Sequence, residues 1–351
     1  MEYLTLKDIA LINMGQSPDS KTYNEEKEGI PFYQGKSDFG KINPIPRVWC
    51  SNPIKIAEKD DILISVRAPI GDTNIATEKC CIGRGLASIR PLNENINKKY
   101  LYYLLNSKYK ELNKFGTGST FKAITKENLC NLKCAEIPDI KEQIEVVKKL
   151  DNVSQIIEIK KKQLEKLSII IKSQFVEMFE NKNYEKLSGK ELFSFSSGKF
   201  LEASKRLENG VPVYGGNGVA WYTDEPLIDF NTIVIGRVGA YCGNVKLIKE
   251  PVWITDNAIF IKQFKKDVYN IDFLYYMMEL VDFSRFAQFS GQPKITQKPL
   301  EEFNYVVPPI EEQIKFSNIV KQIDKQKFES VIKAEKEIEK IQKNIYYKWG
   351  R

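Results

Sequence analysis

The sequence predicts an α+β fold with two pseudo-repeated domains, joined by two long helices that form an antiparallel coiled coil. Three observations support this prediction. First, one ordered set of short segments occurs twice, about 170 residues apart. Second, each copy combines β-branched runs and glycine-rich turns with one aromatic-rich helical segment. Third, a long amphipathic stretch rich in isoleucine, lysine and glutamate follows each copy.

The internal repeat consists of pairs of segments that keep the same order in both halves. In chain order, these pairs are Gly29-Ile-Pro-Phe-Tyr33 with Gly210-Val-Pro-Val-Tyr214, Ile62-Leu-Ile-Ser-Val-Arg67 with Thr232-Ile-Val-Ile-Gly-Arg237, Tyr100-Leu-Tyr-Tyr-Leu-Leu105 with Phe273-Leu-Tyr-Tyr-Met-Met278, Phe115-Gly-Thr-Gly-Ser-Thr-Phe-Lys-Ala-Ile-Thr125 with Phe289-Ser-Gly-Gln-Pro-Lys-Ile-Thr296, and Ile137-Pro-Asp-Ile-Lys-Glu-Gln143 with Val307-Pro-Pro-Ile-Glu-Glu-Gln313. This period is too long for a solenoid and indicates a duplicated domain. Because the sequences between these paired segments differ, the two copies suggest two domains of the same kind that act on two different targets.

The first domain is expected at residues 1–140 and the second at residues 182–309. Each contains a β-branched run that predicts a strand, a Gly- and Asn-containing turn, and an aromatic-rich helix. The predicted strands are at 62–66 and 232–235, and the turns are at 71–74 and 214–218. The aromatic-rich helices are at 98–113 and 271–286. We expect each domain to be built around a twisted sheet that is mainly antiparallel or mixed.

A central helical spacer is predicted at residues 141–181. Its apolar residues recur mostly every three or four positions, as on one face of a helix: Ile144, Val147, Leu150, Ile157, Leu164, Leu167, Ile171, Phe175 and Met178. Pro138 lies just outside this run, and Asp139 with Glu142 gives a capping-box-like start. Asn181 and Asn183 mark its predicted end.

A distal helical spacer is predicted at residues 310–351. Glu311 and Glu312 suit the positive end of its dipole. Its apolar residues end in the three–four spacing of a coiled coil: Ile314, Ile319, Ile323, Val331, Ala334, Ile338, Ile341 and Ile345. Two rods of similar length can bury their stripes against each other, which predicts the antiparallel pair. The alternative is that each rod packs on its own domain.

Composition bounds the classes of protein to consider. A chain of 351 residues is long enough for two domains with separate cores. The N-terminus is mixed and polar, unlike a signal peptide, and no apolar run approaches the roughly 20 residues of a membrane span. We therefore expect a cytoplasmic protein without a membrane segment. The net charge of +7 permits DNA binding through a localised patch.

Catalysis by this chain is not expected. It has no histidine, which excludes Ser-His, Cys-His and other histidine-based mechanisms. Cys130 and Cys134 lack a second pair of ligands, so we expect no metal site. Neither Asn43-Pro-Ile-Pro46 nor Asn52-Pro-Ile54 matches the motif of an amino-methyltransferase, and a phosphate-binding loop is missing. Asp60-Asp61 is interpreted as a chance acidic pair.

The repeated glycine–lysine element is the first candidate for DNA contact. It provides Gly118, Ser119 and Lys122 in the first half, and Gln292 and Lys294 in the second. Free backbone N–H groups, hydroxyls and one ammonium can clamp a phosphate, while the isoleucine that follows anchors the loop. An exposed turn that only leads into the next strand is the alternative.

Two arginines and several loop residues are further candidates. Arg67 and Arg237 follow matching strands, and arginine can contact guanine or a phosphate with two hydrogen bonds. An internal salt bridge is the alternative for both. Polar or aromatic loop residues that can reach base edges are Gln34, Lys36, Tyr214 and Asn217.

Taken together, these residues resemble the specificity subunit of a type I restriction–modification system, over essentially the whole chain. The most specific segments are 137–143 and 307–313, which are similar to the family's Pro-Pro-x-x-Glu-Gln openings of its two helical spacers. Segments 61–67 and 118–124, with their second-half counterparts, are similar to its target-recognition domains. The first opening departs from the pattern, since Asp139 follows Pro138 in place of a second proline.

The resemblance implies a DNA-reading scaffold without a catalytic site. Each target-recognition domain would read one half of an asymmetric bipartite target, and the helices would set the gap between the halves. Two modification subunits, which methylate adenine, and the restriction subunits would dock on the chain. No cofactor is expected in this chain; S-adenosylmethionine, ATP and magnesium would belong to the partners.

Two other classes remain open at this stage. A self-sufficient DNA methyltransferase or nuclease would modify DNA on its own. A stand-alone coiled-coil DNA-binding or interaction protein would bind DNA without changing its methylation in the presence of a modification subunit.

Overall fold

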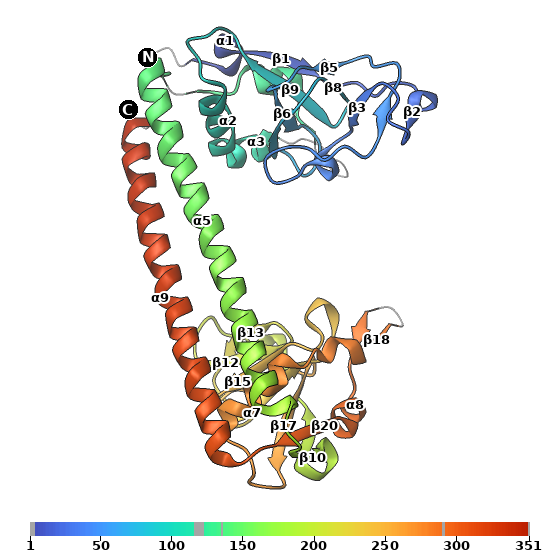
Figure 1. Ribbon diagram of the computed structural model, residues 1–351, viewed down its shortest axis with the longest axis vertical. Coiled ribbons are helices and arrows are strands. Elements are labelled where there is room, and N and C mark those ends of the chain that lie inside the picture. The colour runs from blue at the N-terminus through green and yellow to red at the C-terminus, as the bar shows by residue number, and fades with distance from the viewer. Residues whose placement is uncertain (1–3, 116–122, 135, 290–291, 350–351) are drawn as a thin grey trace. The chain divides into compact units, whose positions relative to one another are not determined.

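The computed structural model describes residues 4–115, 123–134, 136–289 and 292–349. Side chains of the last helix are described continuously as far as Ala334. The chain forms two compact units, which we call unit 1 (residues 1–158 and 333–351) and unit 2 (residues 159–332). Each unit therefore contains part of both long helices (Figure 1). No helix within the described ranges is both long and apolar enough to cross a membrane.

Unit 1 contains two sheets and a group of short helices. The first sheet is antiparallel, in the order β1 (Ala10–Met14), β9 (Leu86–Pro91), β6 (Ile62–Ser65) and β7 (Thr73–Ile75). The second sheet is mixed, in the order β2 (Tyr23–Asn24), β4 (Trp49–Cys50), β3 (Ile30–Tyr33), β8 (Cys80–Ile82) and β5 (Ile56–Ala57). Strands β3 and β8 run parallel. The helices are α1 (Leu6–Ile9), η1 (Ser20–Thr22), η2 (Lys36–Asp38), α2 (Lys98–Ser107), α3 (Tyr109–Phe115), α4 (Lys126–Cys130) and the start of α5 (Ile140–Phe175).

Unit 2 repeats this plan. Its antiparallel sheet has the order β11 (Phe193–Ser197), β17 (Ala258–Phe264), β14 (Thr232–Gly236) and β15 (Val245–Ile248). The second sheet has the order β13 (Gly218–Thr223), β12 (Val211–Gly215) and β16 (Trp253–Ile254), with β12 and β16 parallel. Two small sheets pair β10 (Glu185–Ser188) with β20 (Asn304–Val307), and β18 (Gln288–Phe289) with β19 (Pro293–Lys294). The helices are the end of α5, the π-helical η3 (Val176–Glu180), α6 (Gly189–Leu192), η4 (Ala203–Lys205), η5 (Gly239–Tyr241), α7 (Ile271–Leu280), η6 (Phe283–Phe286), α8 (Gln297–Glu302) and the first part of α9 (Ile310–Trp349).

The predicted strands and helices are found, with changes at one turn and in both aromatic-rich helices, since 98–113 divides into α2 and α3 and 271–286 into α7 and η6. The expected sheets are mixed and mainly antiparallel, and both aromatic-rich segments form helices, α2 and α7. The segment 214–218 turns between β12 and β13 as predicted. In contrast, Thr73 and Asn74 were expected in a turn but belong to β7, where their buried positions pair with β6.

A glutamine attaches each long helix to its unit. In unit 1 the Gln143 side chain is fully buried and donates to the carbonyl oxygens of Asn95 and Pro138, both at 2.8 Å. Its own oxygen accepts the backbone N–H of Asn97 at 2.8 Å. The Asn97 side chain in turn caps the N-terminus of α2. The start of α5 and the start of α2 are therefore held by one amide group.

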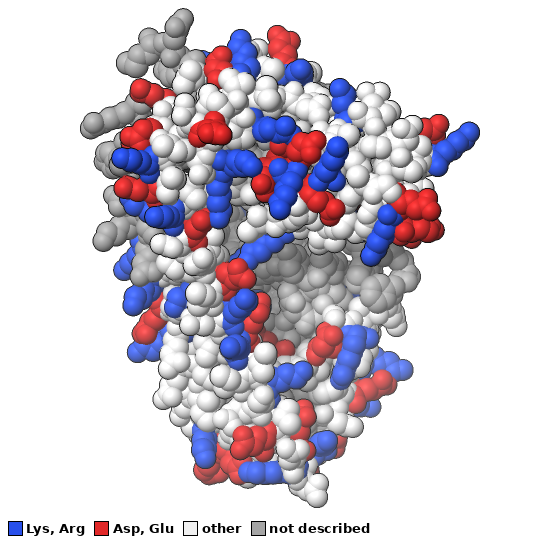
Figure 2. Space-filling view, turned by 45° about the horizontal axis from the view of Figure 1, so that its top comes forward, with Lys and Arg blue, Asp and Glu red and all other residues white. Residues whose placement is uncertain are grey.

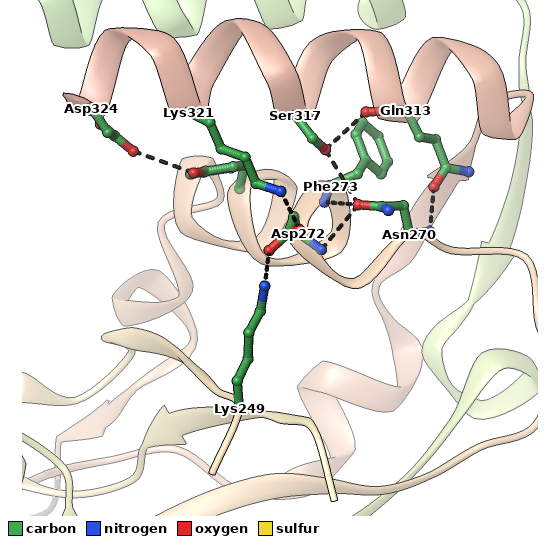
Figure 3. Close-up of polar contacts among 9 residues, drawn as sticks. Lys249, Asn270, Asp272, Phe273, Gln313, Ser317, Lys321 and Asp324 are labelled. Atoms are coloured by element: carbon green, nitrogen blue, oxygen red, sulfur yellow. Dashed lines mark hydrogen bonds and ion pairs between the residues drawn. The ribbon is translucent and has the colours of Figure 1, made fainter. Parts of the chain in front are cut away.

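Unit 2 has the same arrangement at α9 and α7 (Figure 3). Gln313 is fully buried, donates to the carbonyls of Val268 and Pro308 at 2.8 Å, and accepts the N–H of Asn270 at 2.9 Å. The Asn270 side chain caps α7. The repeated Glu-Gln motif thus acts through its glutamine, because a buried amide can satisfy three backbone groups that would otherwise be unpaired.

The buried faces of the long helices differ partly from the predicted ones. Val147, Ile171 and Phe175 of α5 are buried, whereas Ile144 and Ile157 are exposed. In α9 the described buried positions are Gln313, Phe316, Ser317, Val320 and the predicted Ala334, whereas Ile314 is 43% exposed. The reason is that Gln313 fixes which side of the first turn faces α7, and Ile314 lies about 100° away around the helix. Side chains of Ile338, Ile341 and Ile345 lie outside the described residues.

Aromatic rings form the centre of the larger core of unit 2. Phe175 of α5, Phe273 of α7 and Phe316 of α9 lie in mutual contact, with ring centroids 5.6–6.3 Å apart. Phe179 joins this group at 5.0 Å from Phe273. Such aromatic pairs add about 0.5–1.5 kcal/mol each beyond the burial of their area. The end of α5 and the start of α9 are thereby fixed to α7.

Candidate functional site

Four loops of unit 1 meet at one end of its sheets. Since β3 and β8 are parallel, the loops 34–36 and 83–85 leave from the same edge. The Gly83 N–H donates to Tyr33 O at 2.8 Å, and the Val66 N–H donates to Gly85 O at 2.9 Å, which brings residues 66–67 alongside. Residues 15–17 follow β1 into the same place, where the Gln16 N–H bonds Ile82 O. We call residues 15–17, 34–36, 66–67 and 83–85 the end loops of unit 1.

The predicted contact residues of unit 1 lie in these end loops. Gln34, Lys36 and Arg67 are all exposed. The Lys36 ammonium forms an ion pair with Asp72 at 2.8 Å, which neutralises part of its charge. Arg67 has no ion pair within the residues that the structure describes, so the alternative of an internal salt bridge is not observed there.

Gly118, Ser119 and Lys122 lie outside the described residues. What is described is the end of their loop: Ala123 pairs with the backbone of Arg67, and Ile124 is 4% exposed. The predicted isoleucine anchor is therefore confirmed. The loop leads into α4, whose N-terminus Thr125 caps.

Unit 2 has end loops at the corresponding places, residues 198–200, 215–218, 236–238 and 255–257. A Cβ on Gly216 would lie 3.6 Å from the Cα of Gly236 and from Val238 O, so the β12–β13 turn touches the end of β14. The backbone of Val238 pairs with Lys294 of β19. The structure therefore brings together three segments that were predicted from separate motifs.

The predicted contact residues of unit 2 differ in exposure. Asn217, Gln292 and Lys294 are exposed. Tyr214 is half-buried, and burial raises the pKa of its hydroxyl. Arg237 is also half-buried, and its Nη1 donates to Ser197 Oγ at 3.2 Å and to the carbonyl of Asp256 at 3.3 Å.

The two arginines do not occupy matching places, contrary to the prediction. In unit 1 the Val66 N–H donates to Gly85 O, and Val66 O accepts the N–H of Ile124. In unit 2 the Arg237 N–H donates to Asn257 O, and Arg237 O accepts the N–H of Ile295. Arg237 therefore corresponds to Val66, one residue before Arg67. Because successive strand residues point to opposite faces, this single step explains why Arg67 is exposed and Arg237 is half-buried.

Charges of both signs are mixed on the surface of the chain. On the face shown in Figure 2, lysine and arginine side chains are interspersed with aspartate and glutamate. Asp61, one of the acidic pair considered above, is 3% exposed and holds Arg90 at 2.6 Å. The described residues contain no group of three or more side chains suited to binding a metal ion.

The family model described as "Type I restriction modification DNA specificity domain" matches the chain twice, at residues 1–168 and 181–340. The chain belongs to this family. Each match contains one copy of the repeated fold and most of the long helix that follows it.

Individual relatives support the assignment to the specificity-domain family. The specificity subunit assigned to the type I restriction enzyme MjaX of Methanocaldococcus jannaschii is 46% identical over 156 residues, which is 44% of this chain and 36% of that subunit. The chain thus spans about a third of the length of that relative. The EcoprrI specificity subunit of Escherichia coli is 26% identical, over 92% of this chain and 88% of its own length.

A solved structure shows the same fold. The S subunit of a type I restriction–modification system from M. genitalium has a TM-score of 0.57 and covers 97% of this chain and 94% of its own, with 20% identity. At this level of identity the likeness concerns the fold alone.

Several residues of this specificity-domain chain were missed by sequence reasoning. Arg84 is exposed in the end loop 83–85, and the Gly-Arg-Gly turn was the signal that could have identified it. Arg206 lies over the ring of Trp221, 3.9 Å from its centroid, and Trp221 is 39% exposed on β13. The guanidinium and the ring form a cation–π contact, and only the fold places these two residues together.

Proposed function

We propose that this chain is the sequence-specific DNA-recognition subunit of a type I restriction–modification complex. The observation that carries the proposal is the double match to the DNA specificity domain over two repeated units, whose end loops have different side chains. The chain itself is not an enzyme. Each unit reads one half of a bipartite target through base contacts, and lysine and arginine contribute affinity through phosphate contacts.

The difference between the end loops supports an asymmetric target. Unit 1 has a long excursion between β3, which ends at Tyr33, and β4, which begins at Trp49. In unit 2 the strands β12 and β13 are joined by a tight turn at Gly216 and Asn217. Loops that differ this much in length and side chains present different groups to the bases, so the two half-sites differ.

The two long helices form the spacer between the half-sites in this proposal, as an antiparallel coiled coil. Support comes from unit 2, where Phe175 contacts Phe316 and a shallow groove of about 350 Å³ is lined by Leu164 and Leu167 on one side and by Gln326 and Ser330 on the other. Later residues of α5 thus meet earlier residues of α9, as an antiparallel pair requires. Target recognition is assigned to residues 1–140 and 182–309, and spacing to 141–181 and 310–351.

Partners supply the chemistry. Two modification subunits dock on the chain and methylate adenine, and restriction subunits complete the nuclease. S-adenosylmethionine, ATP and magnesium belong to these partners. Binding to chromosomal DNA places the complex in the cytoplasm. The modest net charge of +7 fits a subunit that leaves part of the phosphate contacts to its partners.

The decisive experiment is a genome-wide map of adenine methylation in cells that produce the modification subunit with or without this chain. We expect one new asymmetric two-part motif that appears only with the chain. If an active modification subunit gives no new motif, the assignment is wrong, and the chain is a DNA-binding or interaction protein without an enzymatic partner.

A further inference from the structure

We propose that the turn 83–85 of unit 1 reads a guanine through Arg84, and that the corresponding turn 255–257 of unit 2 reads a cytosine through Asp256. This inference rests on the proposed function, and it assigns one base of each half-site to a named side chain.

The two turns are equivalent in backbone structure. Each has three residues between a strand of the mixed sheet and the central strand of the antiparallel sheet. The first residue donates its N–H to a tyrosine carbonyl, Gly83 to Tyr33 at 2.8 Å and Thr255 to Tyr214 at 2.9 Å. The third residue accepts an N–H from the end of β6 or β14. Arg84 and Asp256 are therefore the same middle position of one turn.

Close packing fixes where Arg84 projects. A Cβ on Gly85 would lie 2.2 Å from Gln34 O, and one on Gly83 would lie 3.1 Å from the Cα of Gln34. Neither position tolerates a larger residue without a shift of the backbone. The Arg84 N–H also donates to Ser17 Oγ at 3.4 Å. The Cα of Arg84 is thus held between the loops that carry Gln34 and Ser17, while its side chain extends into solvent.

Packing is equally tight on the other side of the turn. A Cβ on Gly15 would lie 2.2 Å from Gly83 O, and in unit 2 one on Gly198 would lie 2.2 Å from Thr255 O. The unit 1 turn is therefore packed tightly between two neighbouring loops, and the unit 2 turn is packed tightly against residues 198–200. A rigid base under an exposed side chain is what base reading needs, because the donor or acceptor must meet one base edge with a defined geometry.

The chemistry at this position is opposite in the two units. The Arg84 guanidinium can donate two parallel hydrogen bonds to O6 and N7 of guanine, whereas a carboxylate accepts from the amino group of cytosine. Arg84 has no ion pair within the described part of the chain, and Asp256 is exposed. In unit 2 the Arg237 guanidinium donates to the Asp256 carbonyl at 3.3 Å, which steadies the backbone of this exposed residue.

The test is the adenine-methylation map described above, repeated with Arg84→Ala, Arg84→Lys and Asp256→Ala. For Arg84→Ala we expect one guanine of one half-site to become degenerate, with a discrimination loss of about 5- to 150-fold, while the other half-site is unchanged. Arg84→Lys should relax the same base, since lysine keeps the charge but loses the paired geometry. Asp256→Ala should relax one cytosine in the other half-site.

Lys79→Ala is the matched control, because Lys79 is exposed at the opposite end of β8. An unchanged motif with the Arg84 variants would overturn the inference. So would a uniform loss of methylation that Arg84→Lys restores, since this outcome identifies a phosphate contact. Failure of the proposed function is distinguishable, because the wild-type chain would then give no motif at all.

Discussion

Asp272 of α7 and Lys321 of α9 form an ion pair of 2.6 Å whose polarity is reversed in the other unit, where Lys99 of α2 contacts Asp151 of α5 at 2.8 Å. The positions correspond, because Lys99 and Asp272 each follow the capping asparagine by two residues, and Asp151 and Lys321 each follow the buried glutamine by eight. If α5 packed on α7, Asp151 would face Asp272, and if α9 packed on α2, Lys321 would face Lys99. The reversal therefore favours packing of the start of α5 on α2 and of the start of α9 on α7.

This reversal predicts a measurable coupling in unit 1. Lys99→Asp should destabilise the protein, because it faces Asp151 with a like charge, and Asp151→Lys in the same chain should recover part of the loss. A double-mutant cycle by denaturant unfolding should give a coupling of about 0.5–1 kcal/mol. Incomplete recovery is expected, since Tyr103 donates to Asp151 at 2.6 Å. The matched cycle with Lys110, exposed on α3, should give a coupling near zero; equal values in both cycles would contradict the pairing role.

The buried glutamines should contribute strongly to stability. Gln313→Ala removes three hydrogen bonds and leaves the Asn270 N–H and two carbonyls without their partner in a buried place. The expected loss of unfolding free energy is about 2–4 kcal/mol, measured by urea unfolding, and Gln143→Ala should behave alike. Gln155→Ala, at an exposed position of α5, should change stability by less than about 0.5 kcal/mol. Equal effects at Gln155 and Gln313 would show that the buried amide has no special part.

The ion pairs of Asp272 should make unit 2 sensitive to acid. Burial alone raises the pKa of this carboxyl, but hydrogen bonds and charges from Lys249 and Lys321 outweigh it and hold the pKa below the ordinary value of 3.8 (Figure 3). A lowered pKa stabilises the folded state above the ordinary value, and the stabilisation is lost as the pH falls through the folded-state pKa. Asp272→Asn should therefore be less stable than the wild type at pH 7, and the difference should shrink below about pH 4. Asp267→Asn, at an exposed position, is the control; a difference for Asp272→Asn that is independent of pH would contradict the electrostatic cause.

Much of the fold was predictable because it depends on local pattern. Repeated motifs, helical periodicity and the residues before Gln143 and Gln313 indicated two α+β copies and two long helices. The register was not predictable in the same way. Both strand motifs end in arginine, so an alignment by residue type pairs Arg67 with Arg237. The hydrogen bonds show that β14 reaches its arginine one position earlier.

The candidate site was predictable only in part, for a related reason. Loops 34–36, 66–67 and the end of the glycine–lysine element could be predicted as candidates one by one, since each follows a recognisable strand or precedes a helix, but the sequence did not predict that they meet. The place of Arg84 in the site could not be predicted from the sequence, because its spatial neighbour Gln34 is 50 positions away. Only the parallel pairing of β3 with β8 brings the two loops together. The role of Gln143 was hidden likewise, because its hydrogen-bond partners Asn95 and Asn97 lie in the preceding domain.

The different surroundings of two basic residues predict different contributions to DNA affinity. Arg67 is exposed, whereas the Lys36 ammonium already has Asp72 at 2.8 Å. With the chain in complex with its modification subunits, Arg67→Ala should weaken binding to the methylated target sequence by about 5- to 10-fold at 100 mM salt and reduce the salt slope by about one. Lys36→Ala should weaken binding by less than about 2-fold, because Asp72 already neutralises part of the Lys36 charge. The carboxylate that the substitution frees repels phosphate only weakly through salt. Fluorescence anisotropy at several salt concentrations measures both, and a stronger effect of Lys36→Ala would contradict this ranking.

The spacer proposal makes a quantitative prediction about DNA length. Seven residues added to α5 within 141–180, together with seven added to α9 within 311–348, lengthen each helix by about 10 Å, or roughly three base pairs, while keeping the apolar stripes in phase. The methylation motif should then have a longer gap and the same two half-sites. An insertion in only one helix should abolish methylation, because antiparallel partners would no longer match along their length. If the double insertion leaves the gap unchanged, the helices do not measure the distance between the half-sites, and the two units must find their targets through the partner subunits instead.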